Sequence, residues 1–147
     1  MLAPLQLINY RAAVRSYERF DDVEVSDDNS MGIALRLQFN HDYDEDTETQ
    51  RLKLVVQYNQ DEDVPEEQKP FIAHRGEIGV EGWLRWISKE IAEREDADRL
   101  MRANGLSMLY GIARVRVADL TDQGNGSRLL LPSVNFQNIV EEDESGQ

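Results

Sequence analysis

Hydrophobic and polar residues alternate over the first half of the chain in the pattern of β-strands. Leu5 to Phe20 alternates roughly between apolar and polar positions, so we expect a strand there and a loop over Asp21 to Ser30. From Ile33 to Phe39 every second residue is large and apolar, which is typical of a strand with one buried face. The acidic run from Asn40 to Gln50 separates it from Leu52 to Tyr58, where the alternation returns. A hairpin is therefore predicted.

The segment from Phe71 to Leu84 predicts a fourth strand that contains three glycines. Gly76, Gly79 and Gly82 lie at intervals of three residues, without the lysine of a P-loop or the fingerprint of a dinucleotide site. Glycine inside a strand often marks a bulge. We therefore expect a bent or bulged strand in an antiparallel sheet and do not favour phosphate binding.

Two helices are predicted after the strands. Ser88 to Ala103 is rich in Glu, Arg, Ala and Leu and ends at Asn104-Gly105, a helix stop signal. Ser107 to Leu120 has apolar residues at helical spacing and ends before Gly124. Apolar groups surround most of this second helix, so we expect it to pack on the sheet and on another helix or subunit. The predicted class is α+β, with a four-stranded antiparallel sheet and two helices on one face.

The last segments predict an extended strap and a tail. Leu129 to Gln137 is largely apolar, but Pro132 prevents it from being an ordinary central strand. Glu141 to Gln147 contains no apolar residue and is expected to be disordered. The chain of 147 residues has the size of one compact domain. We expect a single domain over residues 1–140 and a disordered acidic tail over residues 141–147.

Composition narrows the classes of function. The formal net charge of −13, with basic residues scattered among carboxylates, argues against a nucleic-acid partner. The absence of cysteine excludes disulfides, thiolate catalysis and cysteine-ligated zinc. No apolar run approaches the roughly 20 residues that span a bilayer, and the start of the chain lacks a signal-peptide pattern. We therefore expect a cytoplasmic protein that does not insert into membranes.

Candidate catalytic and metal-binding residues are few. His41 and His74 are the only histidines, and neither lies in a recognisable motif. Four acidic residues alternate as in a calcium loop: Asp42, Asp44, Asp46 and Glu48. The required glycine and glutamate are replaced by Thr47 and Lys53, so a solvated hairpin loop is the better interpretation. We expect no active site, no metal and no cofactor.

Two segments near the C-terminus resemble the SecB-type export chaperones. The first is Gly105 to Arg114 and the second is Leu131 to Phe136, which contains a Pro-x-Val-Asn-Phe motif. In the first strand, Ser16-Tyr17-Glu18 is similar to the Ser-Phe-Glu of that family. The residues that match the family motif are Tyr110, Arg114, Pro132, Asn135 and Phe136.

The resemblance implies an ATP-independent holdase that binds unfolded client polypeptides and assembles as a dimer or tetramer. It implies apolar client-binding grooves formed by Ile33, Leu35, Leu37, Trp83, Ile139 and Val140, and we expect Trp86 to contribute as well. Ile33, Leu35 and Leu37 are equally well interpreted as core, because alternation shows an apolar face without showing what covers it. The two tryptophans offer large apolar area to a passing chain.

The sequence departs from the family pattern at places that concern its partners. Members that dock the translocase motor carry an acidic residue early in the first strand, where this chain has Val14. Their tail also differs from the short acidic segment Glu141 to Gln147. These departures weigh against delivery to the translocase. The expected partners remain the export motor or, as in solitary SecB-like chaperones, an antitoxin. An adaptor that binds one folded protein is the alternative from another class.

Overall fold

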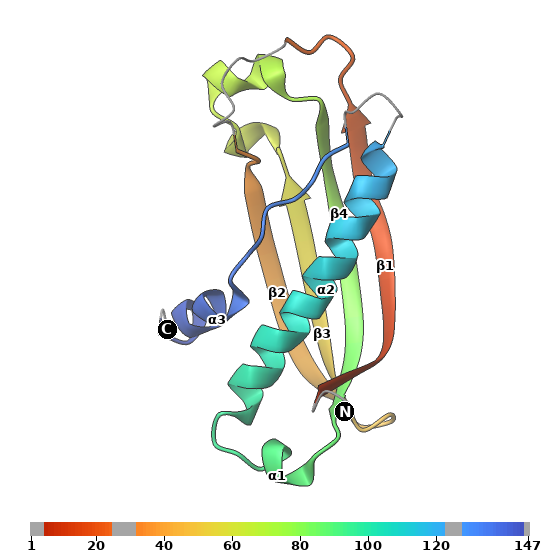
Figure 1. The fold of residues 1–147 in the computed structure, drawn as a ribbon, viewed down its shortest axis with the longest axis vertical. Helices are drawn as coiled ribbons and strands as arrows, with labels where there is room; N and C mark the ends of the chain where they lie inside the picture. The colour runs from red at the N-terminus through yellow and green to blue at the C-terminus, as the bar shows by residue number, and fades with distance from the viewer. Residues whose placement is uncertain (1–4, 25–31, 123–127, 146–147) are drawn as a thin grey trace.

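The computed structural model describes residues 5–24, 32–122 and 128–145. Four antiparallel strands form one sheet in the spatial order β1-β4-β3-β2, which leaves β1 and β2 at its edges (Figure 1). The strands are β1 (Leu5–Arg19), β2 (Leu35–Asp44), β3 (Thr49–Tyr58) and β4 (His74–Trp86). Two short 3-10 helices, η1 (Asp61–Asp63) and η2 (Glu66–Phe71), connect β3 to β4. The predicted α+β class and antiparallel sheet are confirmed.

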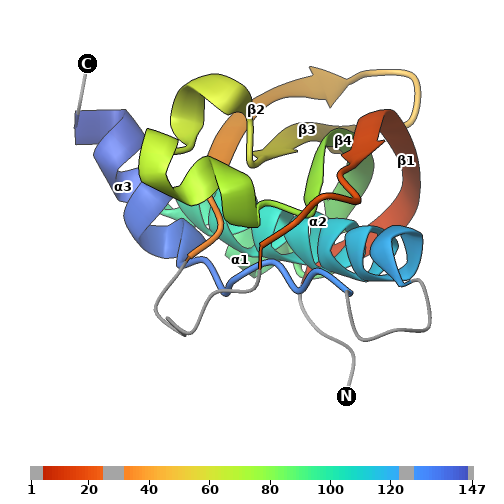
Figure 2. The same ribbon diagram turned by 90° about the horizontal axis from the view of Figure 1, so that it is seen from above.

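Helix α2 (Ala97–Thr121) crosses one face of the sheet, and the core lies between them (Figure 2). Alternation along the strands sends every second side chain toward this inner face. Leu54 and Val80 on neighbouring strands are both buried there, as is Leu109 of α2. Among the described residues, no helix covers the other face of the sheet, which is called the outer face below (Figure 2).

The predicted break between two helices is wrong. The structure has a short α1 (Lys89–Ala92), whose first turn is capped by the hydroxyl of Ser88, and then the single long α2. Asn104 and Gly105 lie inside α2. Gly105 is there because a β-carbon would lie 2.4 Å from Cδ1 of Leu52 on the sheet. The glycine thus permits close packing of the helix and does not end it. Gly124 lies outside the described residues.

The bulges predicted in the fourth strand lie in β1 instead. The pairing of β4 with β3 runs without interruption, whereas β1 shifts register at Ile8 and at Arg15. Two of the glycines of β4 allow side chains to approach its backbone. A β-carbon on Gly76 would collide with the hydroxyl of Tyr58, and one on Gly82 with Leu109.

The β2–β3 hairpin is longer than predicted. Strand β2 continues to Asp44, and its partner β3 begins at Thr49. Residues 40–44 and 49–50 therefore belong to the strands, although their polar composition favoured a loop. The turn itself contains Glu48 at φ 54°, in the left-handed region.

The strap is extended only over residues 128–135, because α3 (Phe136–Ser145) begins inside the predicted motif. Helix α3 packs against α2 and lies beside the edge strand β2 (Figure 1). Residues 141–145, expected to be disordered, continue this helix. Arg102, which is 7% exposed, binds the carboxylate of Glu144, so the acidic end of α3 has a partner on α2.

Candidate functional site

The apolar residues predicted for client binding on the second strand lie on the inner face of the sheet. Leu35 and Leu37 pair with Tyr58 and Val56 of β3, which are fully buried. Ile33, Leu35 and Leu37 are only partly buried and pack against the core. They contribute to the core and also retain some exposed area, so their role in client binding stays a prediction.

The two tryptophans lie on opposite faces of the sheet. Trp86 is partly buried and packs against the core on the inner face. Trp83 projects from the outer face, where the guanidinium of Arg11 lies 5.7 Å from the centre of its ring. A single groove therefore does not contain both side chains.

The two residues predicted after the Asn-Phe pair belong to α3. Val140 is fully buried and Ile139 is partly buried, and both contact the core through the inner side of the helix. Val140 is thus inaccessible to a client while α3 is docked. A bound chain would contact it only if α3 moved away.

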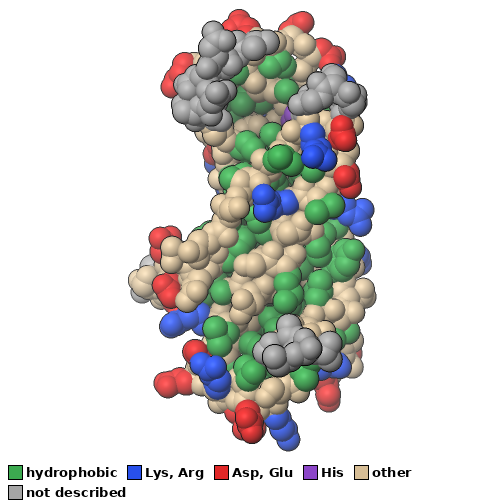
Figure 3. Space-filling view, in the orientation of Figure 1, with side chains coloured by type: hydrophobic (Ala, Val, Ile, Leu, Met, Phe, Trp, Pro, Cys, Tyr) green, Lys and Arg blue, Asp and Glu red, His purple; other side chains and the backbone are tan. Residues whose placement is uncertain are grey.

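A different apolar surface lies open between β1 and α2. Tyr10 and Val14 are 45% and 47% exposed and point to the inner face, because they pair with Gly82 and Ile78. Val115 of α2 is 61% exposed. We name this the β1–α2 surface, and its members are Leu7, Tyr10, Val14, Met108, Ile112 and Val115. Figure 3 shows hydrophobic side chains gathered beside the helix on this face of the molecule.

The backbone of β1 adds hydrogen-bonding groups to this surface. The strand is 15 residues long and pairs on one side only, with β4. An edge strand of this kind presents unpaired N–H and C=O groups that another chain can join. The sequence contained two signals of the surface: alternation in the first strand, and Met108 and Val115 on the side of the helix away from its buried stripe. Neither signal indicated that the two elements lie together.

The motif residues hold the strap and α3 against α2. The hydroxyl of Tyr110 donates to the carbonyl oxygen of Pro132 at 2.5 Å, and Nε of Arg114 donates to the carbonyl oxygen of Leu131 at 3.0 Å. The ring of Phe136 packs edge-on against Tyr110, with centroids 5.4 Å apart. The structure therefore gives these residues a positioning role.

Asn135 begins helix α3. Its Oδ1 accepts a hydrogen bond from the backbone N–H of Asn138 at 3.2 Å, which is the geometry of an N-cap. The Pro-x-Val-Asn-Phe motif therefore combines an extended strap with a helix start.

Burial changes the ionisation of two tyrosines. Desolvation raises the pKa of Tyr110 to about 12, and it raises the pKa of Tyr58 in the core to about 12 as well. In each case the low-polarity surroundings penalise the charged phenolate. Both hydroxyls therefore remain protonated, and that of Tyr110 remains a donor, over the physiological range.

The histidines do not come together. His74 is buried, and its Nδ1 lies 2.8 Å from the hydroxyl of Tyr17, whereas Nε2 of His41 lies 3.7 Å from Asp98 on α2. They occupy different strands and are eight positions apart in register. This arrangement does not provide a paired acid and base.

The acidic hairpin is held by bonds within the protein. Asp42 forms an ion pair with Arg51, which lowers the pKa of the Asp42 carboxyl through its hydrogen bond. Asp44 accepts from the backbone N–H groups of Asp46 and Thr47. Across the described ranges, no group of three or more His, Cys, Asp or Glu residues has an arrangement that could hold a metal ion. None of the described helices is long and apolar enough to cross a membrane.

Comparisons with known proteins give matches among solved structures alone. No family model matches the chain, and no curated protein matches it. Among solved structures, the chain is similar to a Mycobacterium tuberculosis protein, the Rv1957 SecB-like chaperone in complex with a ChAD peptide from the Rv1956 HigA1 antitoxin. The identity is 17%, the match covers 91% of this chain and 90% of that chain, and the TM-score is 0.44.

Proposed function

We propose that this protein is an ATP-independent chaperone that holds unfolded client chains on the β1–α2 surface. The observation that carries the proposal is the exposure of Tyr10, Val14 and Val115 beside an unpaired strand edge. Contiguous exposed apolar area of this kind marks interaction sites on soluble proteins. It is the kind of surface that an extended apolar segment recognises.

Binding would combine two recurring modes of peptide recognition. The free edge of β1 would pair with the backbone of an extended client, which gives affinity without selecting a sequence. The apolar side chains on the inner side of that edge would take every second client side chain. The net charge of −13 would favour clients of net positive charge and speed their encounter.

The same surface also suits self-association. Two copies could pair β1 edges and cover Tyr10, Val14 and Val115 of each other, which would agree with the expected dimer or tetramer. An isologous contact of this type closes on itself and covers the β1 edge of both copies, while β2 remains an edge strand. Client binding would then compete with assembly or use the apolar area that remains exposed at the edge of the interface between the two copies.

The proposal has three versions, which differ in the partner that the protein binds. The alternatives are export clients delivered to the translocase motor, one antitoxin, or one folded partner bound by an adaptor. Val14, in place of an acidic residue, favours the solitary SecB-like role, in which an antitoxin is the client. Mass spectrometry of captured proteins separates these alternatives, because a holdase recovers many chains and a guardian or an adaptor recovers one.

The proposal is tested by light scattering from an aggregating client. We expect the wild-type protein to suppress scattering and Val14→Glu combined with Val115→Glu to suppress it much less. The matched control is Leu130→Glu, because Leu130 is 62% exposed but lies on the strap, away from the β1–α2 surface. Failure of the wild-type protein to suppress scattering at several-fold molar excess would contradict a general holdase role.

A further inference from the structure

The strands carry more cations than anions on the outer face of the sheet, although the whole chain is acidic. Alternation along the strands and the contacts of Arg15 place seven cations there: Arg11, Arg15, Arg36, Arg51, Lys53, Arg75 and Arg85. Five anions of the strands share the face: Glu18, Asp42, Asp44, Glu77 and Glu81. At one end, Asp61, Glu62 and Asp63 of η1 also form ion pairs with Arg75 and Arg36. The strand residues of this face are thus net basic in a protein whose net charge is −13. Because η1 offsets the charge at the end near Arg36 and Arg75, the cations that it leaves uncovered include Arg15 and Lys53.

Salt bridges join the four strands across this face. Glu81 of β4 lies between two cations, at 2.8 Å from Arg11 of β1 and 3.6 Å from Arg51 of β3. Arg51 continues the row to Asp42 of β2 at 2.5 Å. These pairs are partly exposed and contribute little stability individually. Their effect is to fix several long side chains in place over the sheet.

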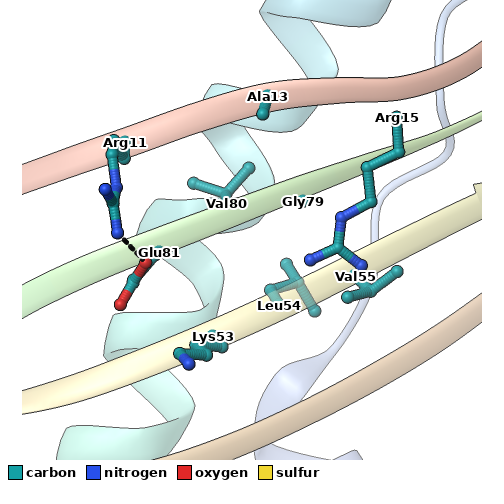
Figure 4. A pocket seen from close by; sticks show the side chains of 9 residues that line it. All are labelled: Arg11, Ala13, Arg15, Lys53, Leu54, Val55, Gly79, Val80 and Glu81. Carbon is teal, nitrogen blue, oxygen red and sulfur yellow. Dashed lines mark hydrogen bonds and ion pairs between the residues drawn. The ribbon is translucent and has the colours of Figure 1, made fainter.

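A shallow hollow opens beside this row, and its rim carries Arg11, Arg15 and Lys53 together with Glu81, which pairs with Arg11 (Figure 4). Its floor is formed by small or apolar residues that include Ala13, Val55 and Gly79. Gly79 lets Arg15 lie flat across the sheet, because a β-carbon at that position would be 2.9 Å from Nε of Arg15. Arg15 is bound only loosely, to Glu77 at 3.5 Å. Lys53 is exposed on the facing side of the hollow.

We propose that this hollow, which we name the outer basic hollow, binds an acidic segment of a partner polypeptide. Arg15 and Lys53 would bind partner carboxylates, while the floor of Ala13, Val55 and Gly79 would contact the apolar residues between them. Charge complementarity with these cations selects an acidic occupant. A second copy that binds through its own acidic segments, such as Glu141 to Glu144, would appear as self-association that the peptide does not displace, and this outcome would contradict the proposal. The site lies on the face opposite the β1–α2 surface and does not depend on the holdase proposal.

Two physical considerations support a peptide in preference to a nucleic acid. Glu77 and Glu81 lie between the cations and would repel the continuous row of phosphates of a nucleic acid. The carboxylates of a peptide are spaced apart and can contact the cations without approaching Glu77 and Glu81. The acidic remainder of the protein does not prevent binding, because the Debye length is about 8 Å at physiological ionic strength and screens charges across the sheet and helix layers. Local charge on the outer face therefore decides which ligand binds.

Trp83 provides a reporter, because it projects from the same face under Arg11. The chain contains two tryptophans, so Trp86→Phe leaves Trp83 as the single tryptophan, which is excited selectively over the tyrosines at long wavelength. The probe is a peptide of about ten alternating Glu and Val residues, which at about 3.3 Å per residue is long enough to cross the hollow. We expect the emission of Trp83 to shift on titration and the binding to weaken as salt is added. Anisotropy of the labelled peptide gives the same measurement on the wild-type chain if Trp86→Phe does not fold.

Variants distinguish the hollow from an effect of net charge. Arg15→Glu combined with Lys53→Glu should weaken binding by about tenfold or more, because two attractive contacts become repulsive. The control pair Lys89→Glu with Arg94→Glu changes the net charge equally on exposed positions elsewhere and should leave binding nearly unchanged. Equal loss in both pairs would overturn the proposal. So would the absence of peptide binding, equal binding of a Lys-Val peptide, or tighter binding of a single-stranded oligonucleotide.

Discussion

The hydroxyl of Tyr110 on α2 donates a hydrogen bond of 2.5 Å to the carbonyl oxygen of Pro132 in the strap. The same ring packs edge-on against Phe136 at the start of α3. One side chain thus connects the long helix to both halves of the C-terminal segment. The motif that most resembles the SecB-type chaperones is, in physical terms, a set of contacts that fixes this segment in place.

Tyr110→Phe tests the hydrogen bond separately from the ring contact. The substitution keeps the aromatic packing on Phe136 but leaves the carbonyl of Pro132 without this donor. We expect the free energy of unfolding to fall by about 1 kcal/mol, the usual net contribution of a hydrogen bond. Urea denaturation followed by circular dichroism measures the change. A fall below about 0.3 kcal/mol would show that solvent replaces the tyrosine hydroxyl at no cost.

Alkaline pH should destabilise the fold through Tyr110 and Tyr58. Each has a folded-state pKa of about 12, above the value of 10.0 for the free side chain. Between these pH values the unfolded chain has lost phenol protons that the folded chain retains. The free energy of unfolding is therefore unaffected by the two tyrosines below pH 10 and decreases as the pH rises toward 12. The decrease is up to about 1.4 kcal/mol per pH unit for each tyrosine.

The Tyr110→Phe variant isolates the contribution of Tyr110 to this pH dependence. Tyr110→Phe should lose stability less steeply than the wild type over the same range, because only Tyr58 then contributes through burial. Denaturation midpoints measured at several alkaline pH values provide the test. If stability falls equally steeply with pH in the two proteins, the Tyr110 hydroxyl has the same pKa in the folded and the unfolded state.

Two glycines of α2 should respond oppositely to replacement by alanine. A β-carbon at Gly105 would meet Leu52 at 2.4 Å, so Gly105→Ala should destabilise by about 1–3 kcal/mol through overpacking. Gly111 has nothing within 4 Å of such an atom, and Gly111→Ala should stabilise by about 0.5–1 kcal/mol through helix propensity. Thermal unfolding of both variants gives the comparison. Stabilisation by both alanines would mean that the helix does not approach the sheet this closely.

Gly105 also explains why the helices were divided wrongly from sequence. A local pattern of Asn followed by Gly has the same appearance whether it ends a helix or permits close packing. The strands were predicted well because alternation is a direct consequence of one buried face. The bulge wrongly predicted in β4 has the same origin, because the glycines of β4 accommodate Tyr58 and Leu109 from distant parts of the chain. Such contacts cannot be read from neighbouring residues.

The position of α3 should depend on Arg102 much more than on Arg99. The side chain of Arg102 is 8% exposed and lies 3.2 Å from Asp98 and 3.8 Å from Asp143, in addition to binding Glu144. Arg102→Met keeps the apolar stem and should reduce stability by about 1–2 kcal/mol, mainly by loosening α3. Hydrogen exchange of residues 136–145 measures this loosening.

Arg99→Met is the matched control for that experiment. Arg99 also binds Glu144, at 3.0 Å, but its side chain is 48% exposed. An exposed ion pair contributes about 0–1 kcal/mol, so the exchange of α3 should change little. Equal acceleration by the two substitutions would mean that burial of Arg102 adds nothing to the docking of α3.

The candidate site was less predictable from sequence than the fold. Alternation identified Leu35 and Leu37 as one apolar face, but it could not indicate whether the protein's own helix covers that face. Val140 is predicted to contact clients, and in the structure it is fully buried on the inner side of α3. Val14 and Val115 are 101 positions apart and acquire a shared role only through the packing of α2 beside β1. Surface exposure depends on such tertiary packing.

Hydrogen exchange of the chain with and without an unfolded client tests the central proposal most directly. We expect new protection in residues 5–19 of β1 and 108–115 of α2, and little change in β2, the other edge strand. The comparison is made at one protein concentration, with the oligomeric state measured in parallel, because self-association would protect the same amides. Client binding that leaves β1 and α2 unprotected would contradict the account.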